Sequence, residues 1–296
     1  MSQGLYENLQ HQMDKLFNHV NQGSIKTRYR YREAVNRFCQ FVADEFRLQK
    51  FENVQEKHIV AYVKHMQEKG LSASTIKTEL SGIRFFHDQV KSRYRLPDNQ
   101  KLGELGATLE RRKFRAVPRA WGDNEFTGAF LLAEAQGKPE MARMLEYARF
   151  IGLRIHETTK LNESMLKQAL ESNYLTIKGK GGLIREVPLT YKSRDLIQRT
   201  LQMSSKQTRL FVGPNEKAHQ VIKRVENWIY IYRDQFTKGD VKLTYHGLRH
   251  AYAQERYAYH LQRETGDDKA ARLAVSRELG HGRDEVTRIY LNSGNK

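Results

Sequence analysis

The sequence contains a single cysteine, Cys39, among its 296 residues. One thiol cannot form an intramolecular disulfide, and it excludes a zinc site built from several cysteines. No uninterrupted apolar stretch approaches the roughly 18 residues that a membrane-spanning helix needs. Residues 1–22 are polar and lack the apolar core of a signal peptide. We therefore expect a soluble, cytoplasmic protein with no membrane partner.

Acidic residues are few relative to basic ones. The sequence has 34 Asp and Glu against 51 Lys and Arg, for a formal net charge of +17. The excess is +9 in residues 1–121 and +8 in residues 122–296, so it is not confined to a basic tail. A polyanion such as nucleic acid is the first candidate partner, and both halves could contact it. The alternative is a generally basic surface of solvated side chains.

Length and apolar content predict two packed domains. Hydrophobic residues make up 39% of the chain, enough for real cores, and domains usually hold roughly 100–200 residues. Three segments of the N-terminal half, typified by Phe38, Tyr62 and Ile83, have apolar residues at helical spacing, without a heptad pattern or repeat. We expect an N-terminal extension over residues 1–23, a helical domain over 24–101, a basic linker over 102–121 and a second domain over 122–296.

The second domain is predicted to combine helices with one β-hairpin. Leu175 and Ile177 alternate with polar residues, and residues 183–187 form a second short strand after a Gly-rich turn. Helical patterns cover residues 123–136, 139–151, 191–203, 217–236, 245–263, 267–279 and 284–291. The predicted fold class is therefore mainly α with a small β-hairpin.

Two candidate sites lie in the first half of this domain. Arg154 follows a predicted helix end, and its planar guanidinium suits two oxygens of one phosphate. Pairing with the nearby carboxylate of Glu157 is the simpler alternative. Lys180 stands in the turn Lys-Gly-Lys-Gly-Gly at residues 178–182. It could enter a groove of DNA or donate a proton, although an ordinary flexible turn would have the same sequence.

Two further candidates follow near the C-terminal end. His246 and Arg249 are three residues apart, which places them on one face near the start of a helix. His250 makes a two-histidine metal site conceivable, but Gly247 replaces the glutamate of the metalloprotease pattern, and no third ligand is evident. We therefore expect no metal. His281 lies in a Gly-rich turn between two predicted helices, and Tyr290 lies on the last of them.

The order of these features resembles the tyrosine recombinases, the phage integrase family. The matching segments are Gly152–Leu161, the hairpin that ends in Arg185-Glu-Val-Pro-Leu, Tyr245–Ala253 and Glu278–Tyr290. The N-terminal helices resemble the family's SAM-like core-binding domain. The resemblance extends over nearly the whole chain and implies an α+β catalytic domain after the helical bundle.

The resemblance implies DNA cleavage through a 3′-phosphotyrosyl intermediate with a free 5′-hydroxyl, without ATP or another cofactor. Tyr290 would be the nucleophile, and a cationic pocket favours its phenolate. Two guanidiniums would stabilise the charge that develops on the phosphate. The implied catalytic set is Arg154, Lys180 as general acid, His246, Arg249, His281 and Tyr290, with Glu157 orienting the pocket.

The expected partner is double-stranded DNA at specific recombination sites. Candidate DNA contacts are basic side chains of the helical domain and the linker, although a solvated helix face is about as good an explanation for each one: Arg28, Arg30, Arg32, Lys77, Arg84, Arg111, Arg112 and Lys113. The family resemblance adds a homotetramer on synapsed DNA, accessory DNA-bending or directionality proteins, and a nucleoid-associated location in the cytoplasm.

The leading functional prediction is the integrase of a phage or other mobile element. Alternatives with the same chemistry are a recombinase that resolves chromosome or plasmid dimers and a type IB topoisomerase-like enzyme. A non-catalytic DNA-binding protein with the same fold would be expected to lack one or more of the six catalytic residues, and all six are present.

Overall fold

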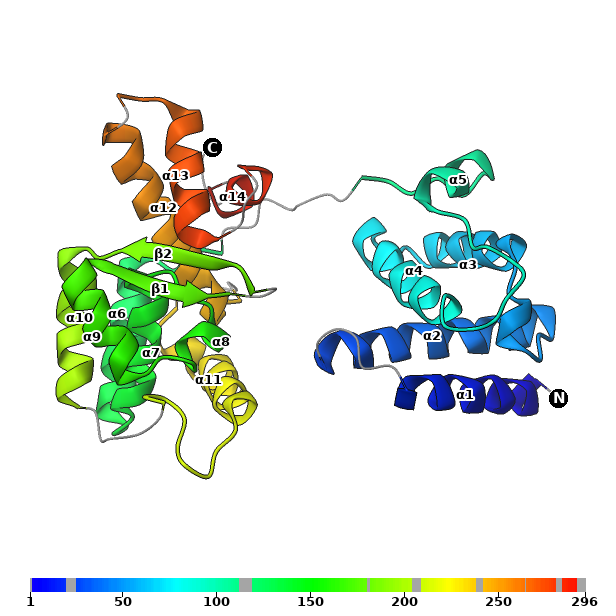
Figure 1. Cartoon of the computed structure of the whole chain (residues 1–296), viewed down its shortest axis with the longest axis horizontal. Coiled ribbons are helices and arrows are strands. Elements are labelled where there is room, and N and C mark those ends of the chain that lie inside the picture. The colour runs from blue at the N-terminus through cyan, green and yellow to red at the C-terminus, as the bar shows by residue number, and fades with distance from the viewer. Residues whose placement is uncertain are drawn as a thin grey trace. The chain divides into compact units, whose positions relative to one another are not determined.

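The computed structural model divides the chain into two compact units, residues 1–114 and 115–296 (Figure 1). The structure describes residues 2–19, 25–111, 119–179, 182–203, 209–237, 242–263, 265–280 and 284–291. Within these residues, no helix is long and apolar enough to span a membrane.

The first unit is a helical bundle. Its helices are α1 (Ser2–His19), α2 (Ile25–Phe46), α3 (Glu56–Glu68), α4 (Ala73–His87) and α5 (Asn99–Glu104), with a short 3₁₀ turn, η1 (Phe51–Asn53). Ser72 accepts a hydrogen bond from the backbone N–H of Thr75 and so caps α4, as its position before an apolar-periodic segment suggests. The predicted three-helix core is present, and α1 and α5 add to it.

The boundaries expected for the first unit differ from those in the structure. Residues 1–23, expected to be an extension, contribute α1, whose Leu9 and Met13 are buried against the bundle. The expected linker from residue 102 begins inside α5, and Leu102 and Ala107 belong to the same core. Only two apolar side chains of α1 are buried, so its polar composition concealed a packed helix.

The second unit is mostly helical. Its helices are α6 (Asp123–Ala135), α7 (Pro139–Phe150), α8 (Ile155–Thr158), α9 (Glu163–Ser172), α10 (Tyr191–Gln202), α11 (Ala218–Tyr232), η3 (Arg233–Gln235), α12 (Tyr245–Arg263), α13 (Asp268–Leu279) and α14 (Asp284–Leu291). The predicted helices are present, whereas α8 and α9 were not expected. Asn162 caps α9 through its side chain, and an asparagine at this position is a signal for the start of a helix.

The only sheet among the described residues is the predicted hairpin. Strand β1 (Tyr174–Lys178) pairs antiparallel with β2 (Ile184–Pro188), so that Leu175 lies opposite Val187 and Ile177 opposite Arg185. Alternate residues of both strands are buried. Arg185 therefore occupies an inward position that an apolar residue would normally fill.

Two glycines let the central elements approach closely. Gly152 has a φ of +68°, and a Cβ there would lie 2.4 Å from a ring carbon of Tyr252 on α12. Gly280 ends α13 with a φ of +64°, and a Cβ there would lie 2.8 Å from the Arg185 side chain. Both positions combine left-handed backbone with lack of space, which only glycine tolerates. They bring the end of α7 and the end of α13 against α12 and β2.

Candidate active site

Helix α12 packs against α7, α11, α13 and α14 and carries two candidate residues. Its first residue, Tyr245, is buried and donates a hydrogen bond of 2.7 Å to the carbonyl oxygen of Met144 in α7. A Cβ at Gly247 would lie 2.3 Å from the carbonyl oxygen of Arg119. The glycine thus permits the chain before α6 to pack against the start of α12. These contacts fix the start of the helix, from which His246 and Arg249 project.

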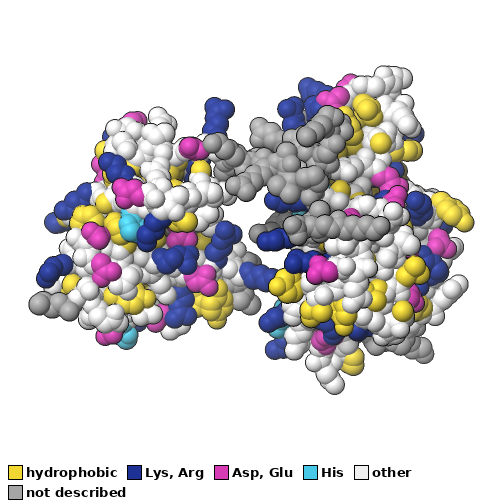
Figure 2. Space-filling view, turned by 180° about the vertical axis from the view of Figure 1, so that it is seen from behind, with side chains coloured by type: hydrophobic (Ala, Val, Ile, Leu, Met, Phe, Trp, Pro, Cys, Tyr) yellow, Lys and Arg dark blue, Asp and Glu magenta, His cyan; other side chains and the backbone are white. Residues whose placement is uncertain are grey.

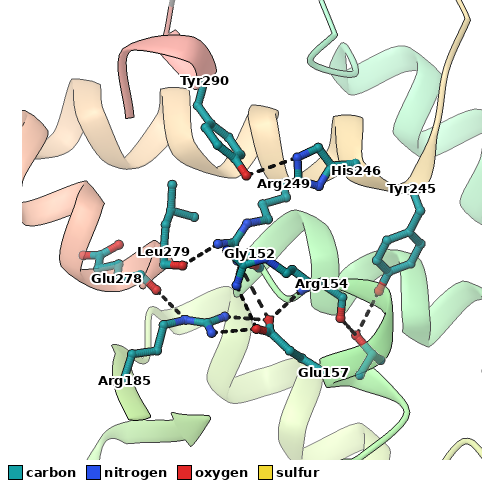
Figure 3. Close-up of polar contacts among 11 residues, drawn as sticks. Gly152, Arg154, Glu157, Arg185, Tyr245, His246, Arg249, Glu278, Leu279 and Tyr290 are labelled. Atoms are coloured by element: carbon teal, nitrogen blue, oxygen red, sulfur yellow. Dashed lines mark hydrogen bonds and ion pairs between the residues drawn. The ribbon is translucent and has the colours of Figure 1, made fainter. Parts of the chain in front are cut away.

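Tyr290, on α14, points into the site from the last described helix (Figure 3). Its side chain is only 6% exposed, and its hydroxyl lies 3.1 Å from Nε2 of His246. Residues 44 positions apart in the sequence thus meet at hydrogen-bonding distance. The structure brings together the candidate nucleophile and a candidate proton acceptor.

Arg249 lies beneath Tyr290 and is fully buried. Its guanidinium carbon is 5.9 Å from the centre of the Tyr290 ring. Its Nη2 donates a 2.5 Å hydrogen bond to the carbonyl oxygen of Leu279, and its Nη1 donates to that of Gly152. Desolvation lowers the pKa of Arg249 to about 10, so the guanidinium stays charged at neutral pH. The site therefore has a buried positive charge directly below the tyrosine ring.

Arg154, the N-cap residue of α8, and Glu157, on α8 itself, form one side of the site. Arg154 Nη1 lies 2.9 Å from Glu157 Oε1, and the backbone N–H of Arg154 donates to Glu157 Oε2 at 2.8 Å. The predicted alternative, pairing of these two residues, is thus present in the structure. The Arg154 side chain is nevertheless 24% exposed, so part of the guanidinium remains open to a ligand.

Arg185, which is not among the predicted site residues, completes this network. Its two terminal nitrogens lie 2.8 and 2.7 Å from the two carboxylate oxygens of Glu157, a bidentate pair with both partners buried. Its Nε donates to the carbonyl oxygen of Glu278 at the end of α13. The signal that could have revealed it is its position two residues before the apolar Val187, on the same face of the predicted strand.

The ionisation of Glu157 and His246 follows from these contacts. Burial alone would raise the pKa of Glu157, but the hydrogen bonds and charge of Arg185 outweigh it and lower that pKa to about 2. His246 is itself exposed, although other residues of the site surround its ring. Partial desolvation, then His250 and the nearby arginines, lower the pKa of His246 to about 4. At neutral pH the site therefore contains a carboxylate and a neutral imidazole.

A pocket of about 670 Å³ opens beside His246 and Arg154. It lies between α8, α11 and the start of α12, and its wall includes Arg233 and Lys242. Cations predominate among its charged residues, which favours an anionic ligand. Among the described residues, no group of three or more His, Cys, Asp or Glu side chains is arranged to hold a metal ion.

Two members of the predicted catalytic set cannot be placed. Lys180, in the hairpin turn, and His281, after α13, lie outside the described residues. The residues directly before them, Gly179 and Gly280, are described. Gly179 donates a backbone hydrogen bond to Leu183 across the turn, and Gly280 lies against Arg185.

The candidate DNA-binding residues of the first unit differ in their surroundings. Arg32 pairs with Asp14 of α1 at 2.6 Å, and Lys77 donates to the carbonyl oxygen of Glu110 at 2.7 Å. Arg84 donates twice to the carbonyl oxygen of Pro97, which gives it a structural role in holding the segment before α5. The predicted DNA contacts of these three residues stay predictions.

The other DNA-binding candidates that the structure describes are partly or wholly exposed. Arg28 is half-buried, and Arg30 and Arg111 are exposed. Arg112 and Lys113 lie outside the described residues. Figure 2 shows Lys and Arg side chains spread over the visible face of both units, with Asp and Glu side chains between them. Basic charge is therefore dispersed over both units on this face.

A helical bundle followed by a mostly helical unit, with tyrosine, histidine and arginines converging around α12, defines a class of phosphate-directed enzymes that use a tyrosine. Residues 131–296 match the model of the phage integrase family, and residues 7–94 match that of the phage integrase N-terminal SAM-like domain. The chain belongs to the phage integrase family, the tyrosine recombinases, enzymes that cleave and rejoin DNA.

Similar sequences carry the same family name. Tyrosine recombinase XerC of Bacillus licheniformis is 24% identical over 252 residues, which cover 82% of this chain and 78% of XerC. Tyrosine recombinase XerD of Halalkalibacterium halodurans is 25% identical over 289 residues, covering 93% and 90% of the two chains.

Solved structures agree on the fold. A lambda integrase dimer bound to a core site matches with a TM-score of 0.66 and 14% identity, covering 96% of this chain and 95% of that one. The integrase of transposon Tn1549, in complex with transposon right-end DNA, matches with a TM-score of 0.62 and 16% identity, covering 97% and 93%. These matches confirm the predicted fold class.

Proposed function

We propose that this tyrosine recombinase is site-specific and breaks each DNA strand by attack of the Tyr290 hydroxyl on a backbone phosphodiester. The Tyr290 oxygen forms a bond to phosphorus while the bond to the 5′-oxygen breaks. The products are a 3′-phosphotyrosyl linkage and a strand with a free 5′-hydroxyl. The observation that carries this proposal is the 3.1 Å contact of the Tyr290 hydroxyl with Nε2 of His246.

His246 is the proposed acceptor of the Tyr290 proton. Its pKa of about 4 leaves the imidazole neutral at pH 7, and only a neutral ring nitrogen can accept a hydrogen bond from the phenol. The geometry favours proton transfer, because Nε2 is directed at the hydroxyl.

The remaining roles concern the phosphate. Arg154, partly exposed at the pocket, and Arg249, buried below the tyrosine, would stabilise the extra negative charge of the pentacoordinate phosphorane. The Glu157 carboxylate orients Arg154 because it accepts hydrogen bonds from both the guanidinium and the backbone N–H of Arg154. Lys180 would protonate the leaving 5′-oxygen, and His281 would donate to the phosphate. Rejoining reverses these steps, so no ATP is consumed.

The curated relatives favour one biological role among the alternatives. XerC and XerD match most of the chain at about a quarter identity, and they favour recombination that resolves dimers of a chromosome or plasmid over the leading prediction of a mobile-element integrase. The proposed partner is double-stranded DNA with specific sites. A tetramer on synapsed DNA is proposed because the lambda integrase that shares this fold has been solved as a tetramer on a Holliday junction.

Genetic tests separate the two roles. Deletion of the gene should cause plasmid multimers and unsegregated chromosomes to accumulate if the protein resolves dimers, and wild-type but not Tyr290→Phe protein should restore segregation. If the protein is a mobile-element integrase, the deletion should leave segregation unchanged and abolish the circular junction of an excised element, which junction amplification would detect.

A further inference from the structure

Helix α12 carries a second histidine, His250, one turn after His246. Its side chain is 2% exposed, and its ring stacks on that of Tyr290 with centroids 4.3 Å apart and an interplanar angle of 21°. The His246 ring stands edge-on to both, at 5.2 Å from His250 and 5.4 Å from Tyr290. The tyrosine ring thus lies on a surface formed by two imidazoles.

The backbone of Tyr290 is held by the same helix. The backbone carbonyl of Tyr290 lies near the His250 ring and acts to raise the pKa of that histidine. Gln254, four residues further along α12, reaches that carbonyl oxygen with its Nε2 at 3.3 Å. His246, His250 and Gln254 recur every fourth residue and so lie on one face of α12. They contact three parts of one residue: the hydroxyl, the ring face and the main chain.

We infer that His250 and Gln254 are positioning residues that hold Tyr290 in line for attack, in a cradle formed by His246, His250 and Gln254. The inference rests on the proposed role of Tyr290 as nucleophile. Neither residue needs to touch the phosphate to act in this way. Attack needs the oxygen at a defined distance and angle, and displacement of a reacting group by about 1 Å can slow a reaction by about 100-fold.

The short length of α14 explains why Tyr290 needs contacts from α12 to hold it in place. Helix α14 contains eight residues, from Asp284 to Leu291, and a helix that short has little stability of its own in water. It therefore depends on contacts with α12 and α13 for its position. A ring stack and two hydrogen bonds to the residue that must react fix the helix at the position where accuracy is required.

The first experiment measures the exposure of Tyr290 without DNA. Tetranitromethane nitrates accessible tyrosines, and peptide mass spectrometry gives the rate for each one. We expect His250→Ala to raise nitration of Tyr290 at least fivefold, while Tyr147 and Tyr245, buried in the same unit, stay unmodified. His219→Ala, an exposed histidine of α11, is the matched control and should change nothing. Equal nitration of Tyr290 in His250→Ala and wild type would overturn the inference.

The second experiment measures cleavage. The substrate is a nicked duplex carrying the binding site selected from a random-sequence pool, and the covalent adduct is followed in a single turnover. His250→Ala should slow cleavage by about 10- to 100-fold, and Gln254→Met should slow it less, with DNA affinity within twofold of wild type. His250→Phe, which keeps the stacked ring, should recover part of the rate. Gln262→Met, exposed on the same helix, is the control for Gln254→Met.

A third measurement separates positioning of the nucleophile from damage to the pocket. In a Tyr290→Phe background, a DNA strand ending in a 3′-(4-nitrophenyl) phosphate is joined to a 5′-hydroxyl strand. The 5′-oxygen bonds to phosphorus and 4-nitrophenolate leaves, so Tyr290 is not used. Adding His250→Ala should leave this joining rate unchanged, and a comparable loss in joining would refute a positioning role. If Tyr290→Phe still forms adducts, the nucleophile assignment fails, whereas the nitration result still tests the cradle.

Discussion

The contact between Glu157 and Arg185 allows a quantitative prediction. Glu157 is 1% exposed and Arg185 is 6% exposed, and two hydrogen bonds join them. The change Glu157→Gln keeps the size of the side chain but removes the charge that four neighbouring groups stabilise: the guanidiniums of Arg185, Arg154 and Arg249 and the backbone N–H of Arg154. The substitution should therefore destabilise the second unit without leaving a cavity.

The magnitude follows from the pKa of Glu157. A fall from 4.5 to about 2 on folding corresponds to about 3 kcal/mol of stability at neutral pH. Loss of one partner from a buried ion pair costs about 3–5 kcal/mol in other proteins, which agrees. Because the pKa is lowered in the folded state, this stability is present above pH 4.5 and is lost as the pH falls from 4.5 toward 2. The difference between wild type and Glu157→Gln should shrink over the same range.

Tryptophan fluorescence is the appropriate assay. Both tryptophans of the chain, Trp121 and Trp228, lie in the second unit, so urea unfolding followed by their emission reports this unit alone. We expect a constant difference of about 3 kcal/mol between pH 7 and pH 5 and a smaller one at pH 4. A difference below about 1 kcal/mol at pH 7, or one that grows on acidification, would refute the reasoning. Glu163→Gln, at a partly exposed carboxylate of the same unit, should change stability by less than about 0.5 kcal/mol.

Three further predictions test other parts of the molecule. Arg154→Ala should lower the cleavage rate at least 100-fold with DNA affinity within about threefold, because its guanidinium faces the developing charge; cleavage on a nicked duplex checks this, and a wild-type rate would contradict it. Desolvation lowers the pKa of His250 to about 4, so its contribution to stability is present above pH 6.5 and falls by up to about 1.4 kcal/mol per unit as the pH drops toward 4. Urea unfolding of His250→Phe should show a shallower loss, and an unchanged slope would exclude this histidine as the cause. Cys39 is buried, and burial raises the pKa of its thiol, so a thiol reagent should label it only when the first unit unfolds; rapid labelling of the native chain would contradict that burial.

The sequence predicted the fold where local pattern decides it. Periodic apolar residues marked α12 at its observed bounds, and the alternation around Leu175 marked the hairpin. Helix α1 was missed because it buries only Leu9 and Met13 as apolar core residues, too weak a pattern among polar neighbours. Its place in the bundle depends on tertiary contacts with α2, which periodicity does not encode.

The candidate site shows the same limit. The residue types and order of Arg154, His246, Arg249 and Tyr290 were enough to propose phosphodiester chemistry. The sequence could not show that Arg249 is fully buried below Tyr290, or that Arg185 shares Glu157 with Arg154. Arg185 and Glu157 are 28 positions apart in the chain, and only folding brings such residues together.

The central claim is that Tyr290 becomes covalently joined to a DNA 3′-end. The most direct measurement digests the adduct formed on a nicked duplex with the selected site and locates the phosphodeoxynucleotide by peptide mass spectrometry. The proposal predicts the added mass on the peptide containing Tyr290, and no SDS-resistant adduct with Tyr290→Phe. An adduct of wild-type yield in Tyr290→Phe, or a label on another residue, would contradict it.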